Sequence, residues 1–159
     1  MAETVARGLI DTSVLIDLDR LDPDVLPSEL AVSAVTMAEL AAGPHASEDL
    51  TERARRQDRL QRTEVMFDPL PFDADAARAY GRIYAAVTAA GRKARGPRVV
   101  DLLIAATALA NDLPLYTRNR DDSWQPPPTG GRWRRRRAGA SVARPGSGPP
   151  REEAAAAGR

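Results

Sequence analysis

The chain of 159 residues contains no cysteine and a single histidine, His45. The lack of cysteine excludes disulfides, thiol catalysis, iron–sulfur clusters and zinc sites with thiolate ligands. One imidazole does not supply a zinc cage either. Carboxylates are therefore the main groups left for chemistry, and several carboxylates with few alternative catalytic groups indicate a divalent-metal centre.

Long apolar runs are also absent from the sequence. The amino-terminal segment reaches only two large apolar residues in a row, Leu9 and Ile10, before Asp11, which is too short for a signal peptide. No run approaches the roughly 20 apolar residues of a membrane-spanning helix. We therefore expect a cytoplasmic protein without a membrane partner, and the lack of cysteine suits a reducing compartment.

The net charge of +1 conceals two regions of opposite sign. Residues 1–122 carry 15 Lys and Arg against 20 Asp and Glu, a net charge of −5, whereas residues 123–159 carry 8 against 2, a net charge of +6. The second region also holds 6 of the 13 prolines and 6 of the 11 glycines. Such a composition cannot bury a core, so we predict one domain over residues 1–122 and a disordered basic tail over residues 123–159.

Between Leu9 and Arg118, short apolar runs alternate with longer helical patterns, which is typical of an α/β fold with a mainly parallel sheet flanked by helices. The patterns predict strands at residues 7–10, 30–35 and 113–117, and an edge strand or extended link at 67–72. They predict helices at residues 12–18, from 36 to near 43, and at 47–65, 73–90 and 99–111.

Four acids stand near the ends of predicted strands or inside predicted helices: Asp11, Glu39, Asp101 and Asp122. Each has a simpler structural interpretation. Asp11 can cap a helix, and Glu39 can complete a capping box opened by Thr36. Asp101 can lie in the first turn of a helix, where the helix dipole favours its negative charge, and Asp122 can belong to a polar turn. Asp101, however, lies in the most apolar predicted helix, where a buried carboxylate needs a compensating cation or hydrogen bonds.

The predicted fold allows these acids to meet. The carboxyl ends of parallel strands lie along one edge of a sheet, and ligands bind in the crevice there. Clustered carboxylates repel one another unless a cation neutralises them, and hard oxygen ligands suit Mg²⁺ or Mn²⁺ better than zinc. Such a centre suits phosphodiester hydrolysis, because a metal activates water and a second metal can stabilise the leaving oxygen.

Four segments resemble, in order, the motifs of PIN-domain proteins, and above all those of the VapC toxins of type II toxin–antitoxin systems. They are LIDTSVL at residues 9–15, VTMAELAAG at 35–43, VDLLIAATA at 100–108 and LYTRN at 115–119. Each motif alone is weakly specific, but their order and spacing are fairly specific. The resemblance covers about residues 7–122, and it implies a three-layer α/β domain.

The resemblance further implies a Mg²⁺- or Mn²⁺-dependent endoribonuclease, a hydrolase of phosphodiester bonds. The resemblance also implies inhibition by a cognate VapB-like antitoxin and assembly into a homodimer. Its metal-site and catalytic residues would be Asp11, Glu39 and Asp101, with Asp122 as the fourth acid, although Asn119 or Asp121 can take that place. Thr12 or Ser13 would hydrogen-bond a ligand or water.

Arg92, Lys93 and Arg95 lie in a basic segment at residues 91–98. They are candidate contacts for RNA phosphates, since an acidic site needs nearby cations to hold a polyanion. A loop that is merely solvated is an equally good interpretation of the same residues.

The resemblance ends at Asp122, because Ser123 stands where the family has Phe and no apolar strand follows. We interpret residues 123–159 as translated out of frame, which the coding DNA can test. The sheet would then lose its last strand and expose apolar surface.

A rival hypothesis is thus a catalytically impaired protein that binds an antitoxin or RNA. A Mg²⁺-dependent phosphatase shares the acids, but no Gly-rich phosphate loop supports it.

Overall fold

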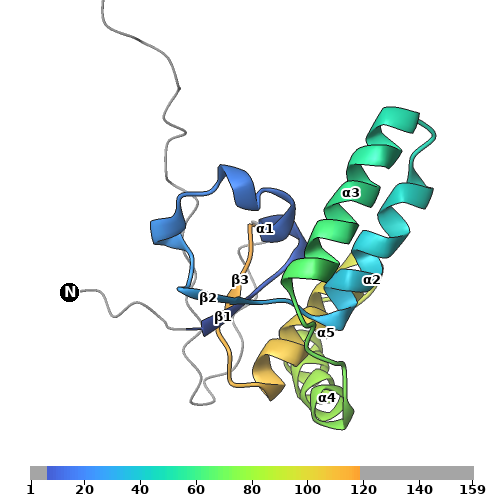
Figure 1. Cartoon of the computed structure of the whole chain (residues 1–159). Helices are drawn as coiled ribbons and strands as arrows, with labels where there is room; N and C mark the ends of the chain where they lie inside the picture. The colour runs from blue at the N-terminus through green and yellow to red at the C-terminus, as the bar shows by residue number, and fades with distance from the viewer. Residues whose placement is uncertain (1–6, 119–159) are drawn as a thin grey trace, which may run out of the picture.

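A three-stranded parallel sheet forms the centre of the protein (Figure 1). The structure is a computed structural model that describes residues 7–118, apart from the side chain at position 97. Its strands are β1 (Arg7–Ile10), β2 (Glu29–Ala31) and β3 (Leu115–Tyr116), in the order β2-β1-β3. Leu9 of β1 lies opposite Ala31 on one side and Leu115 on the other. All three strands therefore end at the same edge of the sheet, as the sequence predicted.

Helices cover both faces of this sheet. Their bounds are α1 (Thr12–Ile16), α2 (Ala34–Ala42), α3 (Leu50–Met66), α4 (Ala74–Ala89) and α5 (Pro97–Ala110). Successive side chains of a strand point to opposite faces, so Leu9 and Ile10 of β1 meet different layers. Leu9 packs on α5, whereas Ile10 packs into a cluster that includes side chains of α1, α2 and α3. The predicted three-layer arrangement is confirmed.

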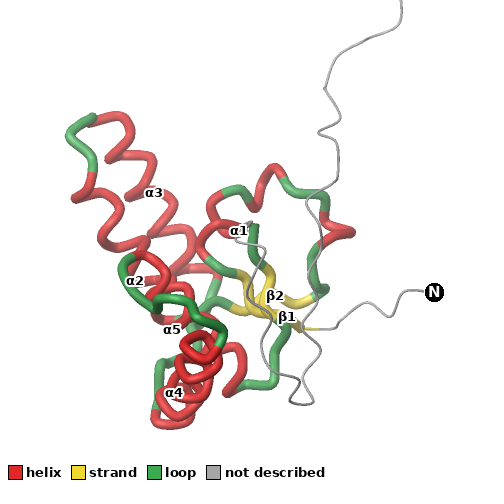
Figure 2. The backbone as a smooth tube through the Cα atoms, turned by 180° about the vertical axis from the view of Figure 1, so that it is seen from behind, coloured by secondary structure: helices red, strands yellow, loops and turns green. Residues whose placement is uncertain are grey.

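The helices α4 and α5 pack against each other and form one helical layer (Figure 2). Their contact combines alanine with larger aliphatic side chains and contains Ala79, Ile83 and Val87 of α4. The other layer includes α2 and α3, which run side by side and extend away from the sheet (Figure 1). None of the helices in residues 7–118 is both long enough and apolar enough to cross a membrane.

The start of α2 corrects one prediction that bears on the site. Ser33 is the N-cap, and its hydroxyl oxygen accepts a hydrogen bond from the Thr36 backbone N–H at 3.0 Å. The strand β2 therefore ends at Ala31 rather than at residue 35, and the predicted capping box of Thr36 and Glu39 is wrong. Thr36 occupies the third helical position, where a capping box needs Glu or Gln. Glu39 thus lies within the helix and has no capping role.

The segment at residues 67–72 is an extended link with a single bridge to the sheet region. The Leu70 N–H donates to the Val32 carbonyl, and the Leu70 carbonyl accepts from the Ala34 N–H, both at 2.8 Å. Pro69 and Pro71 have no N–H to donate, so the pairing cannot spread along the segment. This agrees with the predicted edge strand or link.

The remaining element bounds agree with the predictions to within a few residues. The helix α3 begins at Leu50 rather than at residue 47, and α1 ends at Ile16 and is followed by a short 3₁₀ turn at Leu18–Arg20, η1. The prediction of a helix through residue 18 was therefore too long. The predicted tail at 123–159, its proposed frameshift origin and its expected disorder lie outside the described residues.

Candidate metal centre

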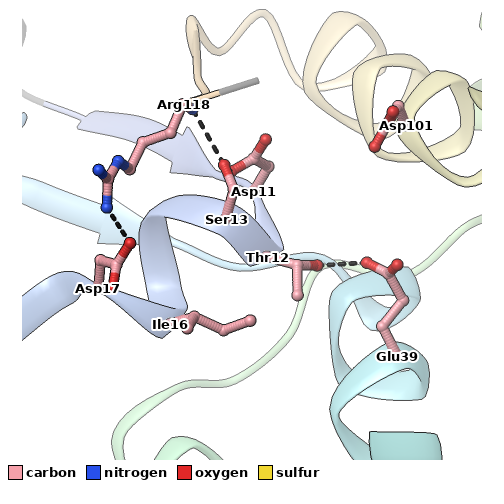
Figure 3. A pocket seen from close by; sticks show the side chains of 8 residues that line it. All are labelled: Asp11, Thr12, Ser13, Ile16, Asp17, Glu39, Asp101 and Arg118. Atoms are coloured by element: carbon pink, nitrogen blue, oxygen red, sulfur yellow. Dashed lines mark hydrogen bonds and ion pairs between the residues drawn. The ribbon is translucent and has the colours of Figure 1, made fainter. Parts of the chain in front are cut away.

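An open cavity of about 520 Å³ lies where β1 and β3 end (Figure 3). Asp11 follows the last residue of β1, Glu39 comes from α2 and Asp101 comes from α5. These three predicted site residues are far apart in the sequence, and the fold brings them to one cavity. Its lining residues are Asp11, Thr12, Ser13, Ile16, Asp17, Glu39, Asp101 and Arg118.

Asp11 serves as the N-cap of α1 and also faces the cavity. Its side chain is buried, with 7% of the residue exposed. Oδ1 accepts hydrogen bonds from the Val14 N–H at 2.9 Å and from the Ser13 hydroxyl at 2.6 Å. Within residues 7–118, Oδ2 accepts no hydrogen bond. The capping and ligand interpretations are therefore compatible, since one oxygen caps the helix and the other remains available to a cation.

Glu39 is held toward the cavity by the first residue of α1. The Thr12 hydroxyl donates a hydrogen bond to Glu39 Oε2 (Figure 3). The carboxylate is only half-buried, so it can still contact water or a ligand. This contact ties α1 to α2 across the cavity wall.

Asp101 differs from the prediction, because it is exposed rather than buried in an apolar environment. The helix α5 does bury an apolar face, which includes Leu102, Ile104 and Ala108. Asp101 is on the side of the helix that lines the cavity. Asp101 therefore does not carry the burial cost that was expected of it. Its case as a metal ligand rests on its position beside Asp11 and Glu39.

The donor set fits a hydrated Mg²⁺ or Mn²⁺ ion. All three side chains offer carboxylate oxygens, the ligands that these hard cations prefer. Among the described residues, no three acidic or histidine side chains are gathered closely enough to hold one ion directly. Mg²⁺ commonly takes one or two protein carboxylates and keeps several waters, which agrees with a wide cavity. His45 does not line the cavity, so zinc fits poorly.

Several predicted site residues stay predictions. Asn119, Asp121 and Asp122 lie outside the described residues, and with them the fourth acid of the centre. The basic residues Arg92, Lys93 and Arg95 lie between α4 and α5 and do not line the cavity. Their loop leads into α5 less than two helical turns before Asp101. Their contact with RNA stays a prediction.

Two charged residues of the cavity were missed by the sequence reasoning, Asp17 and Arg118. The Arg118 N–H donates to the Ser13 hydroxyl oxygen at 3.0 Å, and its guanidinium pairs with Asp17 (Figure 3). Ser13 thus links the end of β3 to Asp11. Arg118 follows the end of β3 much as Asp11 follows β1, so the rule on strand ends that selected Asp11 also selects Arg118.

Comparison with known proteins identifies the family. The PIN domain model matches residues 8–123, which is most of the chain. The chain belongs to the PIN-domain family. Ribonucleases with a PIN domain are in general dependent on divalent metals. The predicted resemblance and fold class are therefore confirmed.

Individual relatives place this PIN domain among the VapC proteins. The chain is 37% identical to "Ribonuclease VapC5" of Mycobacterium tuberculosis over 124 residues, 76% of this chain and 89% of the relative. A crystal structure of VapBC-5 from the same species, a member of the VapBC family of toxin–antitoxin systems, gives a TM-score of 0.65 at 37% identity and covers 73% of this chain and 87% of that chain. VapBC-1 of nontypeable Haemophilus influenzae gives 0.54 at 27% identity, with 71% and 87% covered.

Proposed function

We propose that this protein is the endoribonuclease toxin of a VapBC-type system and that it cleaves RNA with Mg²⁺ or Mn²⁺. The observation that carries the proposal is the meeting of Asp11, Glu39 and Asp101 at one open cavity. It is supported by 37% identity to Ribonuclease VapC5 across 89% of that protein. Carboxylates that line one cavity at the carboxyl edge of a parallel sheet are suited to holding a hydrated divalent ion.

The division of labour within the site follows from its hydrogen bonds. Asp11, Glu39 and Asp101 would hold the ion in part through its bound waters, and the ion when bound activates water and neutralises charge on the leaving oxygen. Ser13 fixes Oδ1 of Asp11, and Thr12 fixes Oε2 of Glu39. Both carboxylates are therefore oriented before substrate arrives, and such preorganisation lowers the cost of reaching the transition state.

The proposed partners are an RNA substrate, a VapB-like antitoxin and a second copy of the chain, in the cytoplasm. The proposal draws on VapBC-5 and VapBC-1, which are VapBC systems by name. A small gene beside this one that encodes a DNA-binding antitoxin would support the pairing. An antitoxin that binds the purified protein and suppresses its cleavage of RNA would establish it.

We expect the purified protein to cleave a structured RNA in Mg²⁺ or Mn²⁺ and to stop when EDTA is added. Excess Mg²⁺ should restore cleavage. The carboxylates are negatively charged, so a cation is needed to neutralise the negative charge that develops on the phosphate. The measurement is the appearance of labelled fragments over time. Cleavage that continues at full rate in EDTA contradicts the proposal. A protein that binds RNA or antitoxin but cleaves nothing with either metal would favour the rival hypothesis of an impaired binding protein.

A further inference from the structure

The charges around the cavity are unbalanced for a site that receives a polyanion. Four carboxylates line it, those of Asp11, Asp17, Glu39 and Asp101. Among the described residues of its wall, Arg118 is the one cation. RNA phosphates are attracted by cations and repelled by carboxylates, so among the described lining residues Arg118 is the side chain that attracts a phosphate entering the cavity.

The backbone of Arg118 is fixed, whereas its side chain has a replaceable partner. The Arg118 N–H donates to the Ser13 hydroxyl oxygen, which itself donates to Asp11. The guanidinium pairs through Nη1 with Oδ2 of Asp17 (Figure 3). The two side chains are 43% and 27% exposed, respectively. The backbone of Arg118 is therefore held beside the proposed metal centre, while its guanidinium is partly exposed to solvent.

Asp17 can lose this partner without being left as an isolated charge. Arg20 Nη1 lies 3.8 Å from Asp17 Oδ1, the oxygen that Arg118 does not use. The Asp17 side chain also makes no capping hydrogen bond to the 3₁₀ turn η1 that follows it. Ion pairs that remain in contact with water add little net stability. A phosphate, in contrast, can accept two parallel hydrogen bonds from one guanidinium.

We propose that Arg118 is a substrate-binding residue whose guanidinium leaves Asp17 and binds a phosphodiester group of RNA in the cavity. In the absence of RNA, Asp17 keeps the guanidinium away from Asp11 and Glu39, where it would compete with the metal. The proposal rests on the proposed ribonuclease function and adds the residue that contacts the substrate backbone. No covalent step is involved, since one ion pair replaces another.

The test compares RNA cleavage in Mg²⁺ by the parent and by Arg118→Ala over a series of salt concentrations. Loss of one phosphate contact should lower the slope of log kcat/KM against log salt by about 0.7, the value for a contact with single-stranded nucleic acid. At the lowest salt, kcat/KM should fall by about tenfold or more, mainly through KM. Arg118→Lys should recover most of the slope but only part of kcat/KM, because an ammonium cannot bind bidentately.

The matched control is Arg62→Ala. Arg62 also pairs with a carboxylate, Asp58, but on the exposed face of α3 and away from the cavity. Its removal should leave the slope and KM unchanged. A slope in Arg118→Ala equal to that of the parent overturns the assignment.

Asp17→Asn separates phosphate binding from a purely structural contact. It should lower KM several-fold, because the guanidinium loses its competitor and the cavity loses a negative charge. If the ion pair only braced the fold, both Asp17→Asn and Arg118→Ala would lower the melting temperature and kcat/KM together, and that outcome would contradict the proposal. A parent protein that cleaves no RNA overturns the proposed function, whereas a parent that cleaves with an unaltered Arg118→Ala slope overturns only this inference.

Discussion

Asp11→Asn is expected to lower kcat/KM for RNA cleavage by at least about 100-fold, the scale on which loss of one preorganised electrostatic group reduces a rate. The substitution removes the charge that Oδ2 presents to the cavity. The fold should be retained, because Asn caps helices as well as Asp does and can still accept from the Val14 N–H. Equal melting temperatures, with the cleavage rate measured on the same samples, would separate chemistry from folding.

Asp11→Ala provides the comparison, because it removes the cap together with the carboxylate. Its free energy of unfolding should fall by about 1 kcal/mol, the usual cost of losing an N-cap, while its cleavage should be as low as that of Asp11→Asn. An Asp11→Asn protein that cleaves within a few-fold of the parent would show that the carboxylate only caps α1. If Asp11→Asn instead has a much lower melting temperature than the parent, its loss of activity would reflect unfolding and not the loss of a metal ligand.

Leu9→Ala is expected to lower the free energy of unfolding by about 2–5 kcal/mol, the range for truncating a buried leucine. Leu9 is 0% exposed and packs against Ile104 and Ala108 of α5. It lies on the central strand, which has partners on both sides, so the surroundings can collapse only in part around the missing atoms. A domain of this size has roughly 5–15 kcal/mol of stability in total, and urea denaturation would measure the change.

Leu50→Ala makes the same chemical change at a site that is 76% exposed at the start of α3. Its effect should remain within about 0.5 kcal/mol, as for surface substitutions in general. The contrast between the two leucines therefore tests whether Leu9 of the central strand is buried against α5. Equal losses in both variants would contradict that arrangement.

The sequence predicted much of the candidate site because two simple rules apply to it. Parallel strands end at one edge of the sheet, so Asp11 was expected to lie near the residues that follow the later strands. The apolar character of residues 99–111 then placed Asp101 on a helix. Glu39 was placed on a helix through a capping box that the structure does not form, since Ser33 caps α2 instead. The order and spacing of the four family motifs supported the same three acids as site residues. These features depend on short stretches of chain, and so they can be recognised without the tertiary structure.

Other features depend on contacts between distant residues and were not predictable in the same way. Ser33 rather than Thr36 caps α2 because β2 ends early, and strand ends depend on pairing with β1. Asp101 is exposed because the packing of α5 leaves its cavity side open. The pair of Asp17 and Arg118 joins residues 101 positions apart, a separation that no local pattern encodes.

Direct binding of Mn²⁺, followed by electron paramagnetic resonance, tests the claim that the three carboxylates form a metal centre. Asp101→Asn is the sharpest variant, because Asp101 is exposed and its replacement should leave the fold intact. We expect Mn²⁺ affinity to fall by about tenfold or more, as when groups around a metal are removed, and to fall similarly in Asp11→Asn and Glu39→Gln. Asp58→Asn, on the exposed face of α3, should bind like the parent. Unchanged Mn²⁺ binding in all three site variants would contradict the metal centre.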